Sequence, residues 1–82
     1  MIVRVRLFAV ARQRVGQEEL QIEVPAAAPT VADVRAALLG RYPSLADVLP
    51  HVKVAVNNDY AADAAPLSAA AEVALIPPVS GG

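Results

Sequence analysis

Few residues of this sequence could do chemistry without help, and they are scattered. The only histidine, His51, has no further ligand at a spacing that would complete a metal site. Glu18 and Glu19 are adjacent in a stretch that alternates like a strand, so they point to opposite faces, which disfavours an acid–base pair. No serine has the G-x-S-x-G context of an activated nucleophile, and no glycine-rich phosphate loop occurs. The chain is therefore predicted to catalyse nothing alone.

The C-terminal segment IPPVSGG is the remaining candidate. Pro77 and Pro78 have a fixed φ and favour an extended, preorganised arm. The residues after Ile76 can span roughly 20 Å at about 3.3–3.6 Å each, and Gly81 and Gly82 lack side chains that would block a narrow channel. A carboxylate is a poor electrophile, so covalent use of this end requires ATP-dependent activation by a partner. The alternative is a trailing end without a task.

Composition limits what else the chain could be. Its 82 residues suffice for one small domain with a single core. The net charge of −1 gives no electrostatic case for nucleic acid or an anionic membrane. The absence of cysteine excludes disulfides, thiolate metal sites and cysteine nucleophiles. No segment resembles a secretion signal or reaches membrane-spanning length, so we expect a cytoplasmic protein.

Alternation of apolar and polar residues predicts the strands that must position this tail. The alternating stretches are residues 2–8, 18–24, 51–57 and 72–76. A further short strand is predicted around Tyr60. Between the first two strands, residues 9–16 predict about two helical turns or a loop, closed by Gly16. The alanine-rich residues 61–71 contain Pro66 and predict loop and turn instead of helix.

The clearest predicted helix begins after Thr30. Thr30 is expected as the N-cap with Asp33 three residues on, a pair that resembles a capping box. The buried stripe of this helix is predicted to be Val31, Val34, Leu38 and Tyr42. Pro43 ends the helix, and the apolar residues up to Leu49 are expected to plug one end of the core. One helix on one face of a mixed sheet is an α+β arrangement.

Strand parity predicts an apolar patch on the face of the sheet that the helix leaves open. If the odd residues of the first strand face the helix, Phe8 points outward, and Ile76 does the same in the last strand. If these two strands are neighbours, their side chains form a patch that Tyr60 could join. A contiguous exposed apolar patch indicates a partner surface, whereas scattered apolar residues need no explanation.

The chain resembles the small subunits of molybdopterin synthase, which are ubiquitin-like β-grasp sulfur carriers. The segments that carry the resemblance are VRLFAVARQRVG, PTVADVRAALLGRYP, VAVN and EVALIPPVSGG. The first three are individually weak, and the PPVSGG ending at residues 77–82 is the specific one. One departure lies just before the last strand, where family members often have a Gly/Asp turn and this chain has Ser68 followed by three alanines.

The resemblance implies a fold and a mechanism. The fold would be a β-grasp domain over residues 1–76, with four to five strands, followed by an extended tail over residues 77–82. An E1-like enzyme would adenylate Gly82 with ATP and Mg²⁺, and a sulfur donor would convert the acyl-adenylate to a thiocarboxylate. The tail would enter the active site of the large subunit of molybdopterin synthase and deliver sulfur to cyclic pyranopterin monophosphate. The inserting arm would consist of Pro77, Pro78, Val79, Ser80 and Gly81.

The resemblance also implies how the chain meets its partners. Phe8, Tyr60 and Ile76 would be apolar contacts of the large subunit, and Arg12 a polar one, in a heterotetramer of two small and two large subunits. The chain would be a carrier that is no enzyme on its own and binds no cofactor itself. Three alternatives stay open: a sulfur carrier for another pathway such as thiazole synthesis, a ubiquitin-like protein modifier, and a non-covalent interaction module.

Overall fold

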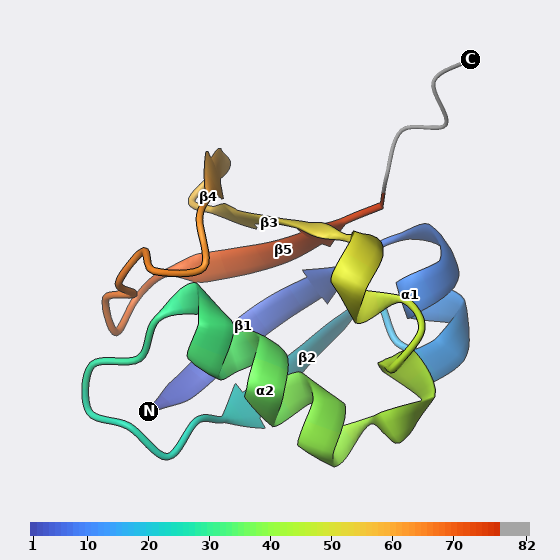
Figure 1. Ribbon diagram of the computed structural model, residues 1–82, viewed down its shortest axis with the longest axis horizontal. Coiled ribbons are helices and arrows are strands. Elements are labelled where there is room, and N and C mark those ends of the chain that lie inside the picture. The colour runs from blue at the N-terminus through green and yellow to red at the C-terminus, as the bar shows by residue number, and fades with distance from the viewer. Residues whose placement is uncertain (78–82) are drawn as a thin grey trace.

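The computed structural model describes residues 1–77, which form a five-stranded mixed sheet with the helices packed on one face (Figure 1). The strands are β1 (Ile2–Leu7), β2 (Glu19–Glu23), β3 (Lys53–Val56), β4 (Asp59–Ala61) and β5 (Glu72–Ile76). Their order across the sheet is β2-β1-β5-β3-β4. The pair β1 and β5 is parallel and the other three pairs are antiparallel. The last strand therefore lies in the middle of the sheet, between the first and the third.

A short helix, α1 (Ala9–Val15), connects β1 to β2, which decides between the two alternatives, helix or loop, that the sequence left open. It ends at Gly16, which has a left-handed backbone (φ 86°) and donates its N–H to the Arg12 carbonyl at 2.7 Å. This geometry is one that glycine adopts without strain. The first strand is one residue shorter than predicted, because Phe8 is the N-cap of α1. Its backbone is nevertheless extended (φ −131°, ψ 155°) and continues the direction of the strand.

The main helix, α2 (Val31–Arg41), begins with the predicted capping box. The Asp33 N–H donates to Thr30 Oγ1 at 3.4 Å, and the Thr30 N–H donates to Asp33 Oδ2 at 2.9 Å. These two bonds satisfy backbone donors that the first helical turn leaves open. Three of the four predicted stripe residues, Val31, Val34 and Leu38, are buried, and Tyr42 is half-buried just beyond the helix.

Two 3₁₀ turns, η1 (Pro43–Leu45) and η2 (Leu49–His51), lead from α2 to β3. Leu45 of η1, Leu49 of η2 and Val48 between the two turns are buried and plug one end of the core, as predicted. The third strand is shorter than the predicted residues 51–57, because His51 still belongs to η2 and Asn57 to the turn that follows.

The residues that follow β4 form loop and turn, which confirms the prediction made from Pro66. The loop lies against the start of α2: the Val31 N–H donates to the Ala65 carbonyl at 3.0 Å, and the Leu67 N–H donates to the Pro29 carbonyl at 2.9 Å. Ser68 and Ala71 close a turn just before β5 through a 3.1 Å hydrogen bond. No helix within the described residues is long and apolar enough to cross a bilayer.

Candidate functional site

The face of the sheet turned away from α2, called here the outer face, carries the candidate site. On β1 and β5 the odd residues are buried under α2, and the even residues are exposed or half-buried. The parallel register pairs Arg6 with Ala74 and Leu7 with Leu75. The first and last strands are therefore neighbours, as the patch prediction required. One residue further along the same register, Phe8 comes opposite Ile76.

The predicted apolar side chains of the outer face are accessible to different degrees. Phe8 is 39% exposed and Tyr60 is 66% exposed, whereas Ile76 is half-buried. Tyr60 lies on β4, opposite Ala55 of β3, which in turn lies opposite Ala74 of β5. Two strands thus separate Tyr60 from β1, and the patch is not one continuous cluster of the three predicted residues. Their role as a partner surface stays a prediction.

A residue that the sequence prediction missed fills the interval between Ile76 and Tyr60. Lys53 lies opposite Ile76 in the β3–β5 register, and its Nζ sits 5.3 Å from the centroid of the Tyr60 ring. A cation at this distance from an aromatic face is attracted to it. The signal for Lys53 was present in the sequence, since inward-facing Val52 and Val54 leave the residue between them on the outer face.

Two arginines on or near this face, Arg6 and Arg12, form ion pairs with acidic residues. Arg6 lies 4.0 Å from Glu19 and 3.6 Å from Glu72, on the two strands that flank β1. Arg12, the predicted polar contact, donates from Nη1 to Glu18 Oε1 at 3.3 Å across the α1–β2 connection. Both arginines are about half-exposed, so these ion pairs contribute little to folding and can be exchanged for partner contacts.

The root of the tail is held firmly because β5 is the middle strand. Leu75 is fully buried, and backbone partners from β1 and β3 flank it on both sides. The far end of β5 is fixed as well: the Asn57 N–H donates to the Glu72 carbonyl at 2.9 Å, and the Glu72 N–H donates to Asn57 Oδ1 at 3.0 Å. Pro77, the first predicted arm residue, is half-buried. The predicted arm and carrier residues Pro78, Val79, Ser80, Gly81 and Gly82 lie outside the described residues.

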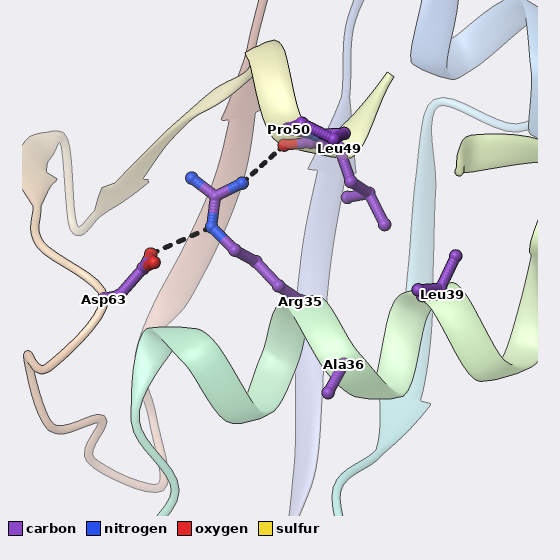
Figure 2. Close-up of a pocket in the computed structure, with 6 residues that line it drawn as sticks. All are labelled: Arg35, Ala36, Leu39, Leu49, Pro50 and Asp63. Atoms are coloured by element: carbon purple, nitrogen blue, oxygen red, sulfur yellow. Dashed lines mark hydrogen bonds and ion pairs between the residues drawn. The ribbon is translucent and has the colours of Figure 1, made fainter. Parts of the chain in front are cut away.

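A hollow on the helix side of the molecule is the other concave feature, and Figure 2 shows that Arg35 crosses it from α2. Arg35 donates to the Leu49 carbonyl at 2.6 Å and to Asp63 Oδ1 at 3.0 Å, as Figure 2 shows. It also donates to the Val52 carbonyl at 2.9 Å. Its guanidinium is therefore already engaged with protein groups. These bonds of Arg35 join α2 to η2 and to the loop after β4. One of them holds the carbonyl of Val52, the residue that precedes Lys53.

A second arginine joins α1 to η1 and to the residues that follow η1. Arg14 of α1 donates to Asp47 Oδ1 at 2.6 Å and Oδ2 at 3.0 Å, and to the Ser44 carbonyl at 2.9 Å. The hydrogen bond from Arg14 holds the pKa of the Asp47 carboxyl below its usual value. Within residues 1–77, no three histidine, cysteine or acidic side chains gather in a way that could hold a metal ion.

Comparison with known proteins places this geometry in a family. The sequence pattern of the ThiS family matches residues 5–82, nearly the whole chain and its last residue included. The chain belongs to the ThiS family. This ThiS-family chain is 36% identical over 80 residues to a molybdopterin synthase sulfur carrier subunit of Arabidopsis thaliana, which covers 98% of this chain and 82% of that protein.

Two solved proteins share the fold of this ThiS-family chain. Small archaeal modifier protein 1 of Haloferax volcanii is 34% identical, over 94% of this chain and 97% of that protein. Its crystal structure superposes with a TM-score of 0.86, at 32% identity and full coverage of both chains. A chain in the complex of subunits 1 and 2 of molybdopterin-converting factor from Helicobacter pylori superposes with a TM-score of 0.71, at 26% identity and full coverage of both. The predicted α+β, ubiquitin-like β-grasp fold is confirmed.

Proposed function

We propose that this chain is the sulfur-carrier subunit of a molybdopterin synthase, with Gly82 as the carrying residue. An E1-like enzyme transfers AMP from ATP to the Gly82 carboxylate with Mg²⁺ as its ion, and pyrophosphate leaves. A sulfur donor then displaces AMP and leaves a thiocarboxylate on Gly82. The tail enters the active site of the large subunit, where the sulfur passes to cyclic pyranopterin monophosphate. The chain is a non-catalytic carrier, cytoplasmic, in a heterotetramer of two small and two large subunits.

The observation that carries this proposal is similarity that extends to the last residue. The family pattern ends at Gly82, and the relatives named molybdopterin synthase sulfur carrier subunit match along nearly the full chain. A terminal Gly-Gly after Pro77 and Pro78 suits a narrow channel, because glycine adds no side chain and proline limits the flexibility of the arm.

The geometry of the described residues supports the same role. Because β5 is the central strand, a force on the tail meets hydrogen bonds to β1 and β3 on both sides. The outer face carries exposed Phe8 and Tyr60 beside this root. A partner that covers the outer face would therefore meet the start of the tail at a fixed point, the end of β5. A chain of this family in complex with a second subunit of molybdopterin-converting factor supports such an arrangement.

Intact-mass measurement tests the chemistry directly. After incubation with a cognate activating enzyme, ATP, Mg²⁺ and a sulfur donor, we expect the mass increase of one oxygen replaced by sulfur, located on the C-terminal peptide. A chain without Gly82, and a chain with one residue appended after it, should fold normally and show no such increase. Sulfur transfer by either variant to cyclic pyranopterin monophosphate would contradict a mechanism based on the terminal carboxylate.

Substitution of Phe8 tests the docking face. Phe8→Asp places a charge where an apolar contact is proposed, and we expect at least tenfold weaker binding to the purified large subunit, because a buried unpaired charge is costly. Ile2→Asp is the matched control: Ile2 is also exposed on the outer face of β1, at the end remote from the tail. If the two variants bind the large subunit with equal affinity, Phe8 is not part of the interface.

A second function, covalent protein modification, is favoured by one specific observation. Small archaeal modifier protein 1 is 34% identical to this chain, the same identity as one of the carrier subunits, and its structure superposes over the full chain. A modifier would join the Gly82 carboxyl to lysine side chains of other proteins. Peptides from cell extracts in which Gly82 of this chain is joined to a lysine side chain of another protein would support the modifier. If no such peptides are found in cells that make molybdopterin through this chain, the modifier function is contradicted and the carrier function stands.

A further inference from the structure

Lys53 occupies the centre of the proposed docking surface. It is exposed, it lies opposite Ile76, and its ammonium rests 5.3 Å from the centre of the Tyr60 ring. It is also the only lysine of the chain. Any partner that contacts both Ile76 and Tyr60 must therefore also cover the Lys53 ammonium, because this side chain lies between them.

The charge of Lys53 has no carboxylate partner among the described residues. Four arginines each have a carboxylate oxygen within 4.0 Å: Arg6, Arg12, Arg14 and Arg35. Arg4 and Arg41 share with Lys53 the lack of such a partner within residues 1–77. Arg4, however, lies at the other end of the outer face, level with Glu72, and Arg41 lies at the end of α2 over the Tyr42 ring.

Covering an ammonium without a counter-charge is unfavourable. A lysine taken out of water without hydrogen bonds or an opposite charge costs far more than an apolar contact beside it contributes. The Tyr60 ring compensates only in part, since a cation–π contact is weaker than the lost hydration. A partner that fits this face must therefore supply the missing anion.

We propose that the surface which docks on the outer face presents an aspartate or glutamate carboxylate to Lys53, at the point where the tail leaves β5. This inference rests on the proposed function, in which the partner is the large subunit. The carboxylate makes an ion pair with an ammonium that Tyr60 already holds in place, so little side-chain freedom is lost on binding. It also selects partners, because a surface with a cation at this point meets Lys53 as a like charge.

Binding to the purified large subunit, measured by calorimetry with variants at Lys53, tests the inference. Lys53→Glu should weaken binding by about 30-fold or more, as loss of one partner of a buried charge pair does. Lys53→Gln should weaken it less, and Lys53→Arg should retain most of the affinity because it keeps the charge. Arg41→Glu makes the same change in net charge on the helix side, and its affinity should stay close to that of the wild type.

A charge exchange decides which group Lys53 meets. In the large subunit, the acidic residue that gives the strongest coupling to Lys53 in a double-mutant cycle is replaced by lysine, and this variant should restore binding of Lys53→Glu. Unchanged affinity of Lys53→Glu, in an assay where Phe8→Asp binds weakly, would overturn the Lys53 inference and leave the proposed function in place. No binding of the wild-type chain to the large subunit would instead overturn the proposed function.

Discussion

The two faces of the sheet differ in how strongly folding restricts their residue types, and β5 contributes side chains to both faces. Val73 and Leu75 point to the inner face and are fully buried under α2, whereas Ala74 and Ile76 point to the outer face and are half-buried. The described core contains no buried polar or charged residue. The outer face instead mixes cations, acids and apolar side chains. Folding thus constrains one face to close-packed aliphatic residues, and the other can be adapted to a partner.

Adjacent positions of β5 provide the strongest test of this difference. Leu75→Ala removes fully buried methyl groups and should lower the free energy of unfolding by about 2–5 kcal/mol. Ile76→Ala, one residue on, should cost clearly less stability and instead weaken binding to the partner. Urea denaturation of both variants measures the contrast. Equal losses of stability would mean that the outer face is as much a part of the folding core as the inner face.

The inner face could be predicted from the sequence because its cause is local periodicity. In β1 the buried residues Val3, Val5 and Leu7 alternate with exposed residues, two of which are arginines. This alternation is enough to predict which side of the strand is buried. The capping box at Thr30 and the left-handed Gly16 are also determined by residues within a few positions of each other. That the first and last strands are neighbours was only assumed in the patch prediction, and the strand order of the sheet supplies it.

The outer face could be predicted only in part, because it depends on contacts between distant strands. Parity placed Phe8, Tyr60 and Ile76 outward, but the spatial gap between Tyr60 and β1 depends on the strand order, which periodicity does not give. Lys53 was missed since its importance comes from Tyr60 and Ile76, seven and 23 positions away in the chain. The bonds from Arg35 to two backbone carbonyls were likewise invisible in the sequence.

A substitution of Arg35 should have an intermediate effect on stability. Arg35 is a charged residue, but it lies on the helix side of the sheet and is largely buried. Its side chain is 24% exposed and donates to the carbonyls of Leu49 and Val52. Arg35→Met keeps the length but leaves both carbonyls without this donor, so we expect a loss of about 1.5–3 kcal/mol in the free energy of unfolding.

The control for Arg35 lies on the same helix. Arg41→Met changes an exposed arginine of α2 that has no carboxylate partner within residues 1–77, and it should alter stability by no more than about 0.5 kcal/mol. Thermal or urea unfolding of both variants gives the comparison. If the two variants lose the same stability, the bonds that Arg35 makes across the hollow do not hold η2 and β3 in place.

The smallest expected effect concerns Arg14 and Asp47, which join α1 to the plug of the core. Because the hydrogen bond from Arg14 lowers the pKa of folded Asp47, the pair stabilises the fold while the carboxylate is ionised. This contribution is present above the ordinary aspartate pKa of about 3.9 and is lost as the pH falls through the lower folded value. Asp47→Asn should therefore be less stable than the wild type at pH 7, and the difference should shrink below about pH 4.

Urea unfolding at a series of pH values measures this difference. The matched variant is Arg14→Gln, which removes the other half of the same pair. Both residues are exposed, so each single change should be small, and the double variant should lose little more than either one, since the interaction is already absent. A difference between Asp47→Asn and the wild type that stays constant from pH 7 to pH 3 would show that the carboxylate charge does not hold α1 against the plug. The bond from Arg14 to the Ser44 carbonyl and apolar packing would then hold α1 in place.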